Sequence, residues 1–234
     1  MRVGWNEKTI GWLRSASAFT GFHRQMAGLL APEIAAGGTM CDLGCGVGLI
    51  DLELAPSLEQ VTCVDTSAPA LAALERMAEE RGLSNLETRL TDVDKLEGAW
   101  DTVLSLFFGN GKQMARWLSR CRQCVVAVLA EGEAPSFGPG HPPKYNTAQR
   151  AERELAEAGV AFHMRRGALE YGQPFRSREE AQEFARVYGK DKLAEDLLYL
   201  RTRLTATGDP EYPWYLPQRK RFVIFTLRKE ENRL

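Results

Sequence analysis

The short segment from Cys41 to Gly48 constrains this chain more than any other feature of its sequence. It reads Cys-Asp-Leu-Gly-Cys-Gly-Val-Gly, so three glycines at alternate positions follow an apolar run. Glycine lets a backbone turn sharply and approach a ligand closely, and the start of a following helix offers unpaired N–H groups. Asp42, two residues before the first glycine, would repel a pyrophosphate and suits a ligand with a positive charge or hydroxyl groups. The segment therefore predicts a strand, a glycine loop and a helix that together bind a ligand.

Two further acids follow expected strands. Asp65 ends the β-branched run 61–64, about 20 residues after the first glycine, which is the spacing of an acid that binds a ribose. Asp92 follows the run 86–91. A dinucleotide loop would read G-x-G-x-x-G/A, but Leu49 stands in its third glycine place. Taken singly, Asp65 is also a candidate helix cap and Asp92 a turn acid. Three acids in register at successive strand ends favour one shared ligand.

On these residues the sequence resembles the class I S-adenosylmethionine (SAM)-dependent methyltransferases. The resemblance covers about residues 37–130 by motif. It implies an α/β fold: a Rossmann-like, doubly wound sheet of seven strands, mostly parallel with an antiparallel last strand, and SAM as cofactor. In that family the glycine loop passes the methionyl tail, the second acid accepts from the ribose hydroxyls and the third from the adenine amino group. The cofactor contacts implied here are Asp42, Gly44, Cys45, Gly46, Leu49, Asp65, Thr66, Asp92, Val93, Ser105 and Leu106.

The order of elements predicts four segments. Strands alternate with helices between residues 37 and 171, a pattern that indicates a parallel sheet with right-handed crossovers. We expect a helical arm over 1–36, the SAM-binding core over 37–171, a helical insertion that acts as a lid over 172–218, and the last strand with the C-terminal tail over 219–234.

Composition excludes several classes of partner. Lys and Arg number 30 against 31 Asp and Glu, so the net charge of −1 gives no electrostatic case for nucleic acid. The sequence holds no apolar run of about 18 residues and no apolar signal core at its start, so we expect no membrane partner and a cytoplasmic location. The odd count of five cysteines argues against a disulfide framework. Cys121 and Cys124 lack the second pair of a zinc site, and buried strand cysteines are the favoured interpretation, so no metal is predicted.

Methyl transfer from SAM needs positioning and water exclusion, and it needs a base only when the acceptor carries a proton. The candidates for such a base are His23, His141 and Tyr171. His23 is also a candidate core residue and His141 a candidate solvated loop residue. Phe107 or Phe108, after the fourth strand, can pack near the sulfonium as a cation–π partner.

We therefore predict a SAM-dependent methyltransferase whose partner is a small-molecule methyl acceptor. The segment after the fourth strand lacks the Asn/Asp-Pro-Pro-Tyr/Phe motif of enzymes that methylate amino groups of nucleic acids or glutamine. The alternatives are a methyltransferase of RNA or protein and a SAM-binding protein without catalysis. A nicotinamide-dependent oxidoreductase fits the loop least well. The acceptor, the atom that is methylated and the oligomeric state are not predicted.

Overall fold

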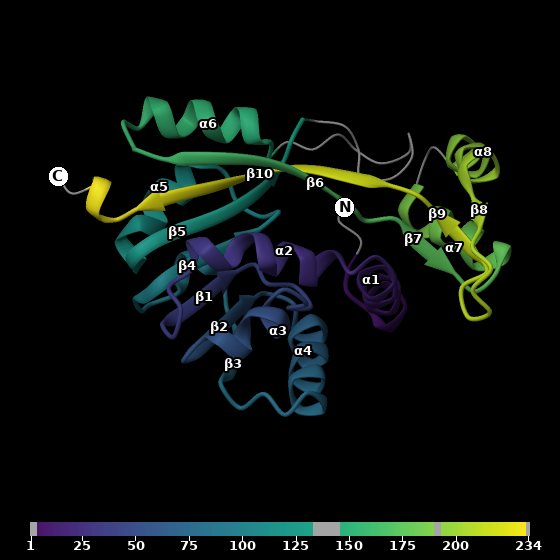
Figure 1. Ribbon diagram of the computed structural model, residues 1–234, viewed down its shortest axis with the longest axis horizontal. Coiled ribbons are helices and arrows are strands. Elements are labelled where there is room, and N and C mark those ends of the chain that lie inside the picture. Colours follow the sequence, from purple (N-terminus) through teal and green to yellow (C-terminus); the bar gives the residue numbers. More distant parts are fainter. Residues whose placement is uncertain (1–3, 133–145, 190–192, 233–234) are drawn as a thin grey trace. The chain divides into compact units, whose positions relative to one another are not determined.

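The computed structural model describes residues 4–132, 146–189 and 193–232 (Figure 1). Within these ranges the chain forms two compact units that alternate along the sequence. One, called here the core unit, consists of residues 23–132, 146–167 and 221–232. The other, called here the accessory unit, consists of residues 4–22, 168–189 and 193–220.

A seven-stranded sheet with the order β3-β2-β1-β4-β5-β10-β6 organises the core unit. Strands β1 to β5 pair in parallel, and β10 pairs with β5 in the antiparallel sense, so the predicted sheet is confirmed. Buried strands of this kind are apolar over most of their length. The strands are β1 (Thr39–Leu43), β2 (Gln60–Asp65), β3 (Leu86–Leu90), β4 (Trp100–Leu106), β5 (Cys121–Ala130), β6 (His163–Glu170) and β10 (Arg219–Arg228).

Helices cover both faces of this sheet. The chain runs from β1 to β2 and β3 in one direction and then through β4 and β5 in the other, so right-handed crossovers place the helices on opposite faces. Figure 1 shows α5 and α6 on one side and α3 and α4 on the other. The helices are α2 (Phe22–Leu30), α3 (Asp51–Leu54), α4 (Ala68–Glu80), α5 (Gly111–Trp117) and α6 (Ala148–Glu157). Short 3-10 turns span Ala31–Glu33, Ala55–Ser57, Val93–Lys95, Leu118–Arg120 and Glu230–Asn232.

Capping residues and apolar side chains in the sequence explain where the helices of the core unit begin and how they pack. Ser67 caps α4, because its hydroxyl accepts from the Ala70 N–H, and Pro69 occupies the first turn where no donor is needed. Met114 and Trp117 of α5 and Leu155 of α6 pack on buried side chains of β4, β5 and β10. This burial removes apolar surface from water and holds the strand ends in place.

The helix after the glycine loop is shorter than the sequence predicts. The pattern favours a helix over about 47–55, but α3 spans only Asp51–Leu54. Gly48 has φ +66°, a left-handed conformation that no helix residue adopts, so helical structure begins after it. Pro56 then lies in the 3-10 turn that follows α3.

The accessory unit has its own core and its own small sheet. Helices α1 (Glu7–Thr20), α7 (Arg178–Gly189) and α8 (Leu193–Arg203) accompany an antiparallel sheet with the order β7-β9-β8. Its strands are β7 (Gln173–Phe175), β8 (Thr205–Ala206) and β9 (Trp214–Leu216). The two helices expected in 172–218 are present, but the three strands were not predicted because runs of two or three residues show no alternation.

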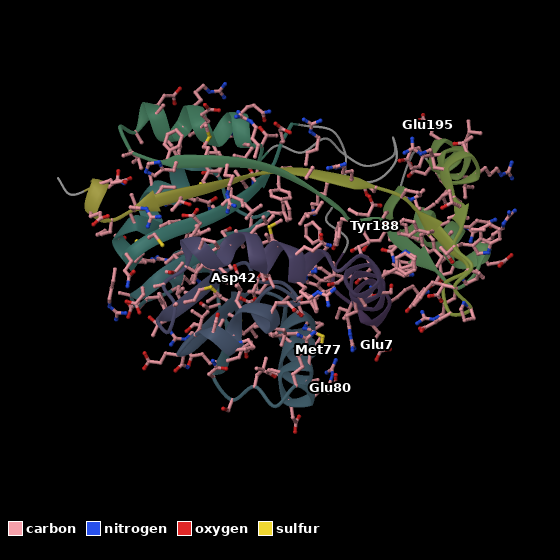
Figure 2. The ribbon with its side chains drawn as sticks, viewed as in Figure 1. Glu7, Asp42, Met77, Glu80, Tyr188 and Glu195 are labelled. Atoms are coloured by element: carbon pink, nitrogen blue, oxygen red, sulfur yellow. The ribbon has the colours of Figure 1, made fainter. Side chains whose placement is uncertain are left out.

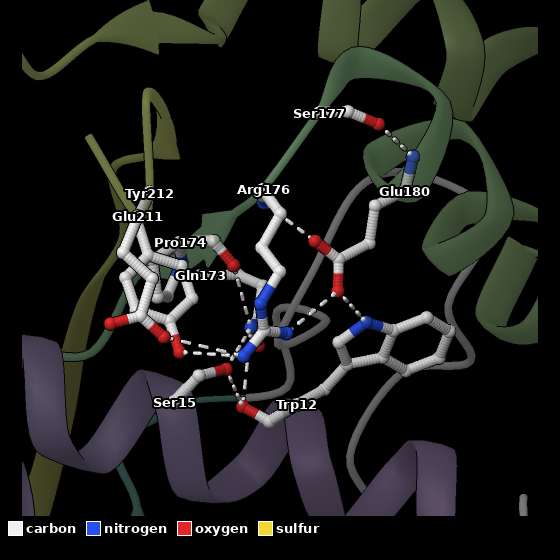
Figure 3. A network of polar contacts seen from close by, with 9 residues as sticks. All are labelled: Trp12, Ser15, Gln173, Pro174, Arg176, Ser177, Glu180, Glu211 and Tyr212. Carbon is white, nitrogen blue, oxygen red and sulfur yellow. Dashed lines mark hydrogen bonds and ion pairs between the residues drawn. The ribbon is translucent and has the colours of Figure 1, made fainter. Parts of the chain in front are cut away.

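Polar bonds tie α1 to the segment around β7 (Figure 3). The indole N–H of Trp12 donates to Glu180 Oε1 at 3.1 Å, and the other oxygen of Glu180 accepts from the Arg176 N–H at 2.6 Å. The side-chain amide of Gln173 donates to the Trp12 carbonyl at 3.1 Å. Ser177 caps α7 by accepting from the Glu180 N–H at 3.1 Å. The N-terminal helix and the 172–218 segment are thus parts of one folded unit.

Candidate cofactor site

The glycine loop follows β1 at the carboxyl edge of the sheet. Gly44, Gly46 and Gly48 have φ values of +76°, +57° and +66°, which larger residues rarely adopt. A β-carbon at Gly44 would lie 2.7 Å from the ring of Phe108, and one at Gly48 would lie 2.4 Å from Leu74 of α4. The loop needs glycine both for its backbone conformation and for its close packing.

Asp65, at the end of β2, holds this loop. Its Oδ2 accepts from the Gly46 N–H at 2.9 Å, and its Oδ1 accepts from the Ser67 N–H at 2.9 Å. The Val64 carbonyl accepts from Gly44 and Cys45 at 2.8 and 3.0 Å. Each carboxylate oxygen still has a second lone pair, so these bonds leave room for ribose hydroxyls. Asp65 therefore serves as a turn and loop anchor and remains able to accept from a ligand.

Two carboxyl groups lie buried beside the loop. Asp42 on β1 (labelled in Figure 2) is 1% exposed and Asp51 at the start of α3 is 0% exposed. None of their four oxygens has a hydrogen-bond partner among the described residues. Burial, followed by the charge of Asp51, raises the pKa of Asp42 well above its usual value. Burial also raises the pKa of Asp51, to about 7. No feature of the glycine motif predicts the role of Asp51.

The third acid lies in a turn. Asp92 is exposed, and its Oδ1 accepts from the Asp94 N–H at 2.8 Å, which caps the 3-10 turn that begins with Val93. The Val93 side chain is buried, whereas Thr66 after β2 is exposed. Asp92 thus has the turn role weighed above, and its contact with adenine stays a prediction.

The turn after β4 carries backbone strain. Phe107 has φ +57°, and it is the one non-glycine residue in the described ranges with a positive φ. Such conformations cost about 1–3 kcal/mol and gather at functional sites. The buried Ser105 hydroxyl donates to the Phe108 carbonyl at 2.8 Å, which fixes the turn. The Phe108 ring stacks on Trp117 at 6.3 Å between ring centres. Leu106 is half-buried beside them.

The glycine loop after β1 and the turn after β4 lie at the point of the sheet where the order of strand addition changes direction. β1 and β4 are neighbours, yet their connections leave in opposite directions. Open α/β sheets bind ligands at the carboxyl ends of the strands beside such a point. The glycine loop and the Phe108 turn flank it, and the ends of β2 and β3 lie in register next to it. The side chains of Leu49, Asp42 and Ser105 at this edge are buried, and their contacts with a cofactor stay predictions.

The three proposed bases differ in their surroundings. His23 is buried on α2 of the core unit. Tyr171 belongs to the accessory unit, where its ring lies 4.2 Å from that of Phe22 and 4.6 Å from the Lys220 ammonium. Burial raises the pKa of the Tyr171 phenol, so it stays neutral at physiological pH. His141 lies outside the described residues.

Cysteine thiols near the sheet are structural. Cys121 and Cys124 are buried, and their thiols donate to the Leu118 and Glu33 carbonyls at 3.5 and 3.3 Å. This agrees with the interpretation as strand cysteines.

Within the described ranges, no three or more His, Cys, Asp or Glu side chains are placed to hold a metal ion. No helix there is long and apolar enough to cross a membrane.

Comparison with known families identifies the domain. Residues 40–128 match the model of a family described as a methyltransferase domain. The match covers less than half of the chain, and it agrees with the resemblance of this part to the class I SAM-dependent methyltransferases. The match begins in β1 and ends in β5, so it contains the glycine loop, Asp65, Asp92 and the Phe107 turn. SAM is the cofactor of this family.

Two curated relatives and one solved structure illustrate the range of methyltransferases that the chain resembles. It is 34% identical over 102 residues to the ribosomal RNA small subunit methyltransferase G of Chlorobium limicola, covering 42% of this chain and 46% of the relative. It is 40% identical over 73 residues to the chloroplastic magnesium protoporphyrin IX methyltransferase of Arabidopsis thaliana, covering 30% and 23%. The chain thus spans less than half of either relative.

The solved structure of magnesium protoporphyrin IX methyltransferase from Synechocystis PCC 6803 with bound SAH superposes with a TM-score of 0.54. The match covers 96% of this chain and 89% of that chain at 16% identity. At this identity the likeness shows a shared fold and leaves the acceptor open.

Proposed function

We propose that this protein transfers the methyl group of SAM to a small molecule. The observation that carries the proposal is the loop anchored on Asp65 inside a methyltransferase domain. It combines a backbone that allows close approach with a carboxylate that retains free lone pairs for ribose hydroxyls. A pyrophosphate-binding dehydrogenase loop would not carry buried acids at Asp42 and Asp51.

SAM supplies a methyl group that its positively charged sulfur already activates. The residues of this chain then have to bind the cofactor and the acceptor, orient them toward each other and exclude water. In the proposed site the glycine loop and Asp42 orient the methionyl tail, Asp65 accepts from the ribose, and Asp92 with the Val93 N–H accommodates adenine. Phe107 and Phe108 form the apolar wall at the end of β4, and the strained turn fixes the position of that wall.

The accessory unit is the proposed source of acceptor selectivity. Aromatic side chains gather on it: Phe19 is exposed, and its ring lies 4.9 Å from that of Tyr215 and 6.2 Å from that of Tyr212. Arg176 lies 5.1 Å above the Tyr212 ring. Rigid aromatic surfaces suit compact, flat acceptors. The lid role of this unit belongs to the same proposal, as does a cytoplasmic location.

An RNA acceptor is the second candidate. The ribosomal RNA methyltransferase relative favours it, because the chain is 34% identical to that protein over 102 residues. The net charge of −1 argues against it, since RNA-binding surfaces carry excess positive charge. The third candidate function is that of a protein that binds SAM without transferring its methyl group.

Two measurements test the proposal. Calorimetry with SAM, SAH and NAD should give binding of the first two and none of NAD. Purified protein is then given SAM with a radiolabelled methyl group and a metabolite extract, total RNA or total protein, with Asp65→Ala as the control. Label in the metabolite fraction supports a small-molecule acceptor, and label in RNA or protein alone contradicts it. Tight SAM binding with no transfer to any fraction would indicate a binding protein.

A further inference from the structure

Glu131, directly after β5, holds two arginine side chains of the core unit. Its Oε2 accepts from the Nε of Arg221 on β10 at 2.8 Å, and its Oε1 lies 3.4 Å from the Nε of Arg166 on β6. The strands β5, β10 and β6 are neighbours in the sheet (Figure 1). The Glu131 side chain is 20% exposed, whereas those of Arg166 and Arg221 are 64% and 72% exposed. One carboxylate thus orients two guanidinium groups at the surface, and the positive charges exceed the negative one.

Both guanidinium groups keep donors that Glu131 does not use. The ion pairs involve the Nε atoms of Arg166 and Arg221, so the terminal nitrogens remain. Within the residues that the structure describes, these two side chains form no other hydrogen bond or ion pair. A guanidinium group has five N–H donors in a planar fork that matches two oxygens of a carboxylate or a phosphate. The two arginines therefore present oriented donors to an oxyanion.

The arginine pair lies at the edge of the sheet that carries the proposed cofactor site. β5 runs parallel to β4, and Glu131 follows the carboxyl end of β5 as Phe107 follows that of β4. Leu106, the last residue of β4, pairs with Val128 of β5. With a rise of about 3.3 Å per residue and about 4.8 Å between strands, the backbone of Glu131 lies about 11 Å from the end of β4. A small molecule whose methyl-accepting atom lies beside β4 can span this distance.

The three charged side chains share the face of the sheet that α5 and α6 cover. Alternate residues of a strand point to the same face, and the residue two positions from each of the three packs in the apolar cluster of that face. These residues are Leu129, Met164 and Val223. The Phe108 ring packs against the same cluster. The Gly132 N–H donates to Gln149 Oε1 at 3.1 Å, so the first turn of α6, which carries partial positive charge, lies beside Glu131.

We propose that the methyl acceptor carries an oxyanion group, a carboxylate or a phosphate, and that Arg166 and Arg221 bind this group beyond the end of β5. The inference rests on the proposed function and deepens it, because it names the chemical class of the small molecule. The anionic end of the acceptor binds to the arginine pair, while its methyl-accepting atom lies at the apolar wall of Phe107 and Phe108. No bond to the oxyanion forms or breaks. Glu131 positions the two arginines and does not touch the acceptor.

The first test divides the metabolite extract by charge and needs no variant. The extract is passed over an anion-exchange column at neutral pH, and each fraction is incubated with the protein and SAM that carries a radiolabelled methyl group. We expect the label to enter a compound of the retained, anionic fraction. A larger incorporation in the unretained fraction overturns the inference. Phosphatase treatment of the retained fraction then identifies the oxyanion, because it destroys a phosphate acceptor and leaves a carboxylate acceptor intact.

The second test uses Arg166→Gln and Arg221→Gln, with Arg153→Gln as the control. Arg153 is an exposed arginine of the same unit whose Nε lies 4.0 Å from Glu157 on α6. Loss of a contact to a part of the acceptor that does not react raises KM and leaves kcat unchanged. We expect the half-saturating amount of the retained fraction to rise about tenfold in each arginine variant, with SAH affinity and the control unchanged. Arg221→Lys keeps the charge without the fork and should lie between.

The outcomes separate this inference from the proposed function. If the label enters only RNA or protein, or no fraction at all, the proposed function itself fails and the inference fails with it. If the label enters the metabolites but the half-saturating amount is the same in Arg166→Gln, Arg221→Gln and the wild type, the function stands and the arginine site is refuted. A rise in both variants, with SAH affinity and the Arg153→Gln control unchanged, supports the site.

Discussion

Replacing Asp65 with alanine should separate the anchoring of the glycine loop from the binding of the ribose. The change removes two hydrogen bonds of 2.9 Å from the Gly46 and Ser67 N–H groups. Bonds to a charged group contribute about 1.5–3 kcal/mol each, and less where water competes. Because Asp65 is half-buried, we expect the free energy of unfolding to fall by about 1–3 kcal/mol in total. The protein should still fold.

The affinity for the cofactor should change more than the free energy of unfolding. A loosened loop and the loss of an acceptor for the ribose together remove at least one charge-assisted bond, and about 1.4 kcal/mol corresponds to tenfold in affinity. We expect at least about a tenfold loss for SAH and a similar factor for 5′-methylthioadenosine, because both ligands carry the ribose. Asp65→Asn keeps one acceptor oxygen and should lie between wild type and alanine.

Calorimetry and chemical denaturation on the same samples provide the assay. The control is Glu59→Ala, which removes an exposed acid next to the other end of β2 and should leave the affinity unchanged. Unchanged SAH affinity in folded Asp65→Ala refutes the ribose role. A loss for SAH with none for 5′-methylthioadenosine would assign Asp65 to the tail instead.

Three further predictions address the loop, the adenine and the buried carboxyl group of Asp51. Gly48→Ala should destabilise the protein by about 1–3 kcal/mol more than Gly82→Ala in denaturation, because both glycines have φ +66° but only the first has a neighbour, Leu74, at 2.4 Å from the new β-carbon. Asp92→Ala should weaken SAH binding more than Asp92→Asn, and equal, negligible losses would leave Asp92 a turn residue only. The unfolding free energy should fall as the pH rises from about 4 to about 7, because the pKa of Asp51 rises from 3.8 to about 7 on folding, and Asp51→Asn should flatten this trend.

Long, well-bounded elements could be predicted from the sequence. β2 spans Gln60–Asp65 as its β-branched run indicates, and the antiparallel β10 follows from the resemblance. The N-terminal arm instead divides into α1 and α2, because Gly21 adopts φ +64° and ends the first helix. The sheet of the accessory unit depends on partners far apart in the sequence, such as Phe175 and Trp214, and no local pattern encodes that pairing.

The candidate site divides in the same way. Its glycines and strand-end acids can be recognised in the sequence, because each of them comes directly after an apolar run that predicts a strand. The strain at Phe107 and the burial of Asp51 depend on tertiary packing. One signal for Asp51 is present in the sequence: it is an acid inside the apolar run Leu49-Ile50-Asp51-Leu52, where a charge on the buried face requires a partner.

The pH trend in stability expected for Asp51 has one physical origin. Burial raises the pKa of Asp51 to about 7, so between about pH 4 and about pH 7 the folded protein holds a proton that the unfolded chain has lost, and raising the pH destabilises the fold. Burial also raises the pKa of Asp42, on β1. Denaturation of Asp51→Asn across this range therefore tests which acid carries the trend. A trend that flattens assigns it to Asp51, and a trend that persists unchanged assigns it to Asp42.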